Sequence, residues 1–119
     1  MKQPAPPATT ACTLTPAFAQ QQLALLDGAP RFVTLLRHGS LEVELYAPRG
    51  QDLQQPHSRD ELYVIVSGSG LFDNGGEVQP FDPGSLLFVP ALRPHRFTQF
   101  TDDFSTWVVF YGPDGGERP

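Results

Sequence analysis

The sequence has few cations and no long apolar run, and both features narrow its possible partners. Lysine and arginine together number 8 against 13 acidic residues, which gives a net charge of −5, and the cations form no cluster. Because nucleic acid and anionic lipid surfaces attract clustered cations, we expect neither as a partner. No apolar stretch approaches the about 20 residues that a transmembrane helix needs.

Cysteine is almost absent as well. The single residue, Cys12, excludes an internal disulfide and suits a reducing compartment. The N-terminal segment has no continuous apolar region of the kind found in secretory signals. We therefore expect a cytoplasmic protein.

Proline and glycine are abundant, and they indicate many turns and few long helices. Residues 1–14 offer almost nothing to bury, which predicts a disordered, flexible tail or an arm that lies over the body. One short helix follows, in which Thr15 suits the N-cap, Pro16 the first helical position and Gly28 the end. We expect this helix to close one end of a single domain, residues 15–119.

From residue 31 onward the apolar residues alternate with a period of two, and turn residues interrupt them. Residues 41–47 alternate leucine and valine with glutamate and tyrosine, which predicts a hairpin strand with one buried face. The expected strands cover residues 31–38, 41–47, 61–67, 70–73, 77–81, 85–89, 94–100 and 104–111. Eight short antiparallel strands with closely spaced turns predict an all-β fold, a jelly-roll β-barrel in particular.

Residues 55–68 combine a strand pattern with unusual polar side chains. If this stretch is extended, Gln55, His57, Glu61 and Tyr63 point to the same side. That face carries an amide, an imidazole and a carboxylate, followed by bulky apolar groups. Such a gradient is typical of a small cavity with a metal or a polar ligand at its floor.

Each of these residues also has a structural explanation. Taken singly, His57 is better explained by a hydrogen-bonded histidine at the core or rim. Glu61 is explained by a cap at a strand end or by an ion pair with Arg59 or Arg93. Aromatic residues at alternating spacing are usually plain core. His38 precedes Gly39, which suggests a turn and a surface histidine.

Two motifs resemble the paired motifs of the cupin superfamily, which are small jelly-roll β-barrels. The first reads Gln55-x-His57-x3-Glu61-x6-Gly68, and it has glutamine where the family has its first histidine. The second reads Gly84-x5-Pro90-x-Leu92-x2-His95-x3-Gln99, and it has leucine and glutamine where the family has glycine and asparagine. The resemblance covers residues 41–111.

The resemblance implies a metal site made of Gln55, His57, Glu61 and His95. Two imidazoles and one carboxylate leave coordination positions open on a divalent transition metal such as Fe, Mn, Ni or Zn. The candidates to line a substrate pocket are Tyr63, Arg93, Phe97 and Gln99. Among these, Arg93 at the cavity mouth could attract a carboxylate.

Two functions remain open for such a site. The first is a mononuclear metal dioxygenase or isomerase that acts on a small organic molecule. The alternative is a non-catalytic small-molecule binding or sensing protein with a weak or empty metal site, which the departures at Gln55, Leu92 and Gln99 favour. Residues 62–66 and 86–88 are apolar on both faces, so we also expect a homodimer.

Overall fold

A computed structural model describes residues 3–119, which form one short helix and eight strands. The helix is α1 (Pro16–Leu23). The strands are β1 (Phe32–His38), β2 (Leu41–Tyr46), β3 (Asp60–Ser67), β4 (Gly70–Asn74), β5 (Glu77–Phe81), β6 (Leu86–Val89), β7 (His95–Thr98) and β8 (Ser105–Tyr111).

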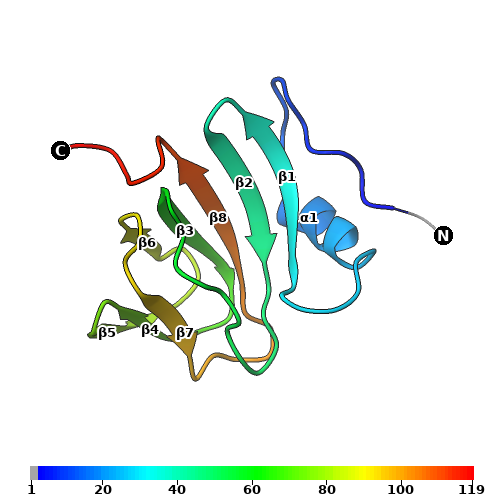
Figure 1. The fold of residues 1–119 in the computed structure, drawn as a ribbon. Coiled ribbons are helices and arrows are strands. Elements are labelled where there is room, and N and C mark those ends of the chain that lie inside the picture. The colour runs from blue at the N-terminus through cyan, green and yellow to red at the C-terminus, as the bar shows by residue number, and fades with distance from the viewer. Residues whose placement is uncertain (1–2) are drawn as a thin grey trace.

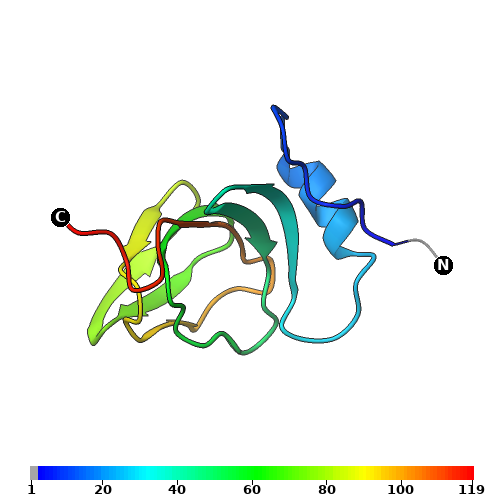
Figure 2. The same cartoon turned by 45° about the horizontal axis from the view of Figure 1, so that its top comes forward.

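The strands form two antiparallel sheets that face each other (Figure 1). The larger sheet has the order β1-β2-β8-β3-β6, and the smaller has the order β5-β4-β7. Figure 2 shows the smaller sheet opposite β3, β8 and β6, while β1 and α1 lie to one side. The predicted all-β jelly-roll barrel with a short helix is confirmed.

Aromatic rings fill the space between the sheets. Phe97 on β7 lies 4.6 Å from Phe72 and 4.7 Å from Phe104, measured between ring centroids. Each is almost fully buried. Burying a side chain of this size stabilises the fold by about 2–3 kcal/mol, so this cluster anchors one sheet on the other.

Helix α1 begins as its sequence predicts. The Thr15 hydroxyl accepts a hydrogen bond from the backbone N–H of Phe18 at 3.1 Å, and Pro16 occupies the first turn. The helix ends at Leu23 with Ala24 as C-cap, one turn before Gly28.

The position of α1 differs from the expected plug at one end of the body. Ala19 and Leu23 pack against Val33, Leu35 and Leu45, which lie on the outer face of the larger sheet. The helix adopts this place because the outer face of the β1–β2 hairpin is apolar and needs a cover.

The segment before the helix is an arm along the edge of the larger sheet. The backbone N–H of Ala8 donates to Leu35 O at 2.9 Å, and the N–H of Arg37 donates to Ala8 O at 2.8 Å. The N–H of Ala5 donates to the side chain of Gln22 at 2.6 Å. For residues 1–14 the sequence predicted either a disordered tail or an arm over the body, and the structure has the arm. The division into a tail of residues 1–14 and a domain of residues 15–119 stays a prediction.

Strand β2 is covered on both faces, which corrects the expectation of one buried face. Leu45 faces the helix, whereas Tyr46 belongs to the core between the sheets. By strand alternation Glu42 and Glu44 share the face of Tyr46. The sequence pattern missed this because a barrel interior can be polar near its mouth.

Among the described residues, two that are not glycine have a positive φ: Leu92 at 68° and Gln99 at 50°. These are the positions where the cupin pattern has glycine and asparagine, the residues that tolerate this conformation best. Gly68 keeps the pattern for a steric reason, since a Cβ there would lie 2.5 Å from Phe104 Cα.

Candidate metal centre

Three predicted side chains meet at one end of the barrel. Glu61 lies near the start of β3, His95 begins β7, and the loop between β2 and β3 carries His57. One ligand atom from each of these residues lies within 4.8 Å of the other two. Glu61 and His95 are buried, and His57 is partly exposed.

His95 is held so that one nitrogen faces Glu61. Its Nδ1 lies 2.9 Å from Arg93 O, and because a carbonyl only accepts, Nδ1 carries a hydrogen. Its Nε2 lies 2.9 Å from Glu61 Oε1. A backbone contact of this kind fixes the tautomer in metal-binding histidines and directs the other nitrogen to the ion.

The two imidazoles differ in their proton affinity. Burial lowers the pKa of His57, although the charge of Glu61 partly opposes this. Burial also acts to lower the pKa of His95, but hydrogen bonds to Glu61 and to Arg93 O outweigh it, so the pKa of His95 is raised. His57 therefore presents a free lone pair near neutral pH, whereas His95 shares a proton with Glu61.

Only one of the two carboxylate oxygens of Glu61 has a hydrogen-bonding partner. Its Oε1 pairs with His95, while Oε2 is buried without any hydrogen-bond partner. The expected alternatives of an ion pair with Arg59 or Arg93 do not occur, because these side chains bond to Glu42 at 2.8 Å and to Asn74 at 2.9 Å. A buried orphan carboxylate oxygen beside two imidazoles fits a divalent metal ion.

The amide near the site comes from Gln54 rather than Gln55. Gln54 Oε1 lies 3.4 Å from His57 Nε2, and its Nε2 donates to the Tyr63 hydroxyl at 3.1 Å. Gln55 is exposed. Strand β3 begins only at Asp60, so the alternation that placed Gln55 beside His57 does not apply to this irregular loop.

Asp52 holds the loop that carries these residues, and sequence reasoning missed it. It is 2% exposed. Its carboxylate accepts from the Tyr46 hydroxyl at 2.7 Å, from the backbone N–H of Phe97 at 2.9 Å and from that of Gln54 at 3.0 Å. In sequence Asp52 is one acidic loop residue, and only these contacts with both sheets distinguish it.

Of the four residues predicted to line a pocket, one reaches the site and three do not. Tyr63 reaches the site, with its hydroxyl 3.0 Å from His95 Nε2, and burial raises its pKa well above the usual value. Phe97 belongs to the aromatic core. Gln99 is exposed, and Arg93 donates to Asn74 Oδ1 and O at the end of β4, next to the β4–β5 turn. Arg93 therefore supports a turn instead of facing the cavity mouth.

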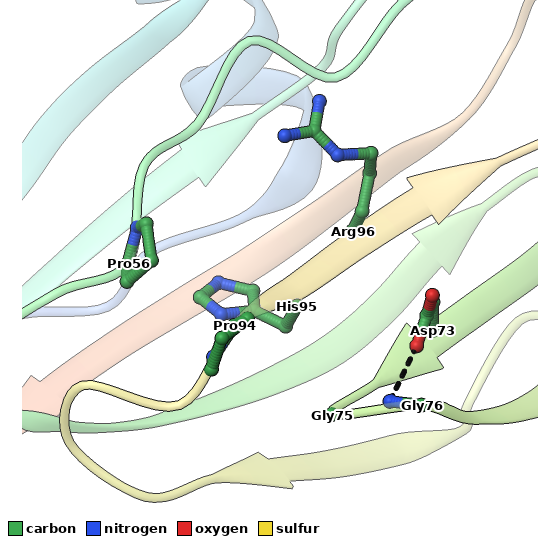
Figure 3. A pocket seen from close by; sticks show the side chains of 7 residues that line it. All are labelled: Pro56, Asp73, Gly75, Gly76, Pro94, His95 and Arg96. Atoms are coloured by element: carbon green, nitrogen blue, oxygen red, sulfur yellow. Dashed lines mark hydrogen bonds between the residues drawn. The ribbon is translucent and has the colours of Figure 1, made fainter.

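A hollow of about 300 Å³ reaches His95 from the side of the β4–β5 turn (Figure 3). Its walls are Pro56, Asp73, Gly75, Gly76, Pro94, His95 and Arg96. Figure 3 shows His95 and Arg96 projecting from β7, with the hydrogen bond from Gly76 to Asp73 beside them. His57 and Glu61 do not line this hollow.

Within residues 3–119, no helix has the length and apolar character needed to cross a membrane.

Comparison with known proteins gives consistent results. An uncharacterised protein of Streptomyces coelicolor is 35% identical over 97 residues, which cover 80% of this chain and 90% of the relative. A cupin 2 conserved barrel domain protein from Salinispora arenicola has a TM-score of 0.64 at 19% identity, over 87% of this chain and 91% of its own. KdgF from Halomonas sp. has a TM-score of 0.63 at 17% identity, over 74% and 84%.

The two structural likenesses concern the fold, and the family follows from the sequence match. The model of the cupin domain family matches residues 42–111, which span β2 to β8 and include His57, Glu61 and His95. The chain therefore belongs to the cupin family.

Proposed function

We propose that this cupin holds a divalent transition metal ion between His57, Glu61 and His95 and uses it to act on a small organic molecule. The observation that carries the proposal is Glu61, whose buried Oε2 lacks a partner next to two imidazoles. Gln54 takes the place first expected for Gln55, as a neutral fourth group beside His57. Fe, Mn, Ni and Zn all suit this set.

Each residue of the site would have a different role. When bound, the ion supplies Lewis acidity and open positions for the oxygen atoms of a ligand. His57 presents a lone pair, His95 presents one at Nε2 once the proton shared with Glu61 is lost, and Glu61 supplies a negative charge. Tyr63 keeps its proton because its pKa is raised, so its hydroxyl can donate to a ligand oxygen. Dioxygenase and isomerase chemistry both use this arrangement.

Elemental analysis tests the proposal directly. We expect one divalent ion per chain in protein purified without chelator, and its loss in His57→Ala and His95→Ala. His38→Ala is the matched control, because His38 is exposed at the end of β1 and removes an imidazole outside the site. Equal metal content in all three variants would show that the site does not hold the ion.

A second candidate function is non-catalytic ligand binding, which the packing of aromatic side chains against both histidines favours. Phe110 packs on His57 with ring centroids 4.6 Å apart, and Tyr63 contacts His95. A thermal-shift screen against sugars, organic acids and phenols separates the two functions. A pure binder shows stabilisation by RT ln(1 + [L]/Kd) with no product.

We also propose a homodimer in the cytoplasm, a location that suits the exposed, unpaired Cys12. Leu86 and Phe88 on β6 are 62% and 46% exposed, next to Leu62 and Val64 on the same outer face. Apolar area of this kind is often an interface. Light scattering should give twice the chain mass at micromolar concentration, and Phe88→Ser should lower it. A monomeric mass for the native chain would refute the dimer.

A further inference from the structure

His57 differs from the other two candidate ligands because it lies on a loop, where no strand pairing fixes its position. Its ring lies 3.4 Å from Gln54 Oε1, which is long for a hydrogen bond, and packs on the ring of Phe110. His95, by contrast, begins β7, and Arg93 O holds its Nδ1 at 2.9 Å. The direction of the His57 ring therefore depends on what holds its backbone.

The turn between β6 and β7 supplies one part of this support. The N–H of Leu92 donates to His57 O at 2.7 Å, and the N–H of Ala91 donates to Asp60 Oδ1 at 2.9 Å. Leu92 has a φ of 68°, and such strained residues persist where the surrounding contacts compensate for their cost. The strained residue is the one that donates to the backbone of a candidate metal ligand.

Residues 112–117, which follow β8 and are called the post-β8 segment, supply the other part. The N–H of Gly115 donates to Ser58 O at 2.7 Å, directly after His57 in the chain. The N–H of Glu117 donates to Asp60 Oδ2 at 2.7 Å. Asp60 is 4% exposed, and each of its two oxygens accepts from a different distant segment. The carboxylate therefore ties this segment to the start of β3.

The sequence of the post-β8 segment favours this close approach. The N–H of Gly116 donates to Pro113 O at 3.1 Å and closes a turn. The Ser58 hydroxyl donates to Asp114 Oδ1 at 2.7 Å. Gly116 has a φ of 92°, and a Cβ there would lie 2.9 Å from Asp60 Oδ1. Glycine is required at this position for both reasons.

We propose that the post-β8 segment is a positioning element of the metal centre: through Ser58 and Asp60 it fixes the backbone that presents His57 to the ion. This inference rests on the proposed metal-binding function. Glu61 and His95 lie on regular strands and contact each other at 2.9 Å, so they do not need the segment. Displacing the segment should therefore disturb one ligand of the three.

Gly116→Ala displaces the segment without changing any charge. Gly28→Ala is the matched control, because Gly28 has a φ of 87° and a Cβ there meets nothing within 4 Å. Calorimetric titration with Zn²⁺ should show binding about tenfold weaker in Gly116→Ala, as for other groups that orient a metal ligand, and native binding in Gly28→Ala. Equal affinity in the native chain and Gly116→Ala would overturn the inference and leave the metal site standing.

A milder pair of variants keeps the test valid if Gly116→Ala does not fold. Asp114 is exposed, so its replacement leaves the core intact. Asp114→Ala removes the acceptor for the Ser58 hydroxyl and should weaken Zn²⁺ binding about twofold. Asp114→Asn removes the same charge but keeps an acceptor oxygen, so it should bind as the native chain does. Equal weakening in both variants would mean that the charge matters and the hydrogen bond does not.

Proton NMR of the metal-free chains gives a measurement that a general loss of stability does not imitate. The native chain should show a nuclear Overhauser contact between the rings of His57 and Phe110, whose centroids lie 4.6 Å apart. Gly116→Ala should lose this contact and keep the native signals of the His95 ring. An unchanged contact, or equal changes at both histidines, would show that the segment does not act through His57. If the native chain binds no Zn²⁺, the metal site is refuted, and this contact alone decides whether the segment positions His57.

Discussion

The interior of the barrel has two ends that are equally buried and chemically opposite. Phe97 and Glu61 are each 1% exposed. Phe97 packs against rings on every side, whereas Glu61 keeps an unpartnered oxygen. Burying an unsatisfied polar group costs stability, so the aromatic end offsets a cost that the polar end imposes. One end stabilises the fold, and the other is available for binding.

Removing a ring from the aromatic end should have the largest effect on stability. We expect Phe97→Ala to lower the free energy of unfolding by about 3–5 kcal/mol, because it loses transfer energy and leaves a cavity. Urea denaturation measures the change. Phe32→Ala, which removes a ring that is 39% exposed at the start of β1, should cost well under half as much. Equal losses in the two variants would show that Phe97 is not part of a tightly packed core.

Replacing Glu44 should stabilise the metal-free protein above neutral pH. Burial raises its pKa to about 7, so the folded state holds a proton that the unfolded state loses near pH 4.5, and stability falls as pH rises between these values. Glu44→Gln removes that loss and should raise the free energy of unfolding by about 2–3 kcal/mol at pH 8. Denaturation at pH 4 is the internal control, where both chains should be equally stable.

The His95–Glu61 pair, at the polar end, gives a second test through the pH dependence of stability. The pKa of His95 is raised by its hydrogen bonds. The stability from the pair is therefore fully present below the unfolded pKa of about 6.5 and lost as pH rises through the folded value. We expect His95→Gln to flatten this part of the metal-free stability profile, by about 1 kcal/mol. An unchanged profile would mean that the pair is not formed.

The smallest expected effect comes from Leu92, whose positive φ is strained. Leu92→Gly should raise stability by about 0.5 kcal/mol, because relief of a left-handed conformation slightly exceeds the entropy that glycine adds to the unfolded chain. Leu53→Gly, at a loop position outside the positive-φ set, should destabilise. A loss in both variants would contradict the strain at Leu92.

The fold and two of the candidate site residues were predictable because they depend on local rules. Alternation and turn residues indicated the eight strands, and Glu61 and His95 lie on regular strands where spacing determines direction. Gln55 was predicted wrongly in place of Gln54 because residues 51–59 are irregular. Asp52, which sets the course of that loop, acts through long-range contacts that no spacing reveals.

The inward direction of Glu44 was missed for a related reason. Alternation correctly separates its face of β2 from that of Leu45, but it does not say which face points into the barrel. That depends on α1 covering the leucine side, a tertiary contact between distant segments. The family pattern likewise carries glycine and asparagine at positions 92 and 99 for backbone reasons that appear only in the φ angles.

Anomalous diffraction from crystals grown with Zn²⁺ or Mn²⁺ tests the central claim most directly. We expect a single strong peak per chain, about 2.0–2.3 Å from a nitrogen of His57, an oxygen of Glu61 and Nε2 of His95. His95 Nε2 must then have exchanged its contact with Glu61 Oε1 for the ion. No peak at this position, with the 2.9 Å contact between His95 and Glu61 intact, would contradict the metal centre.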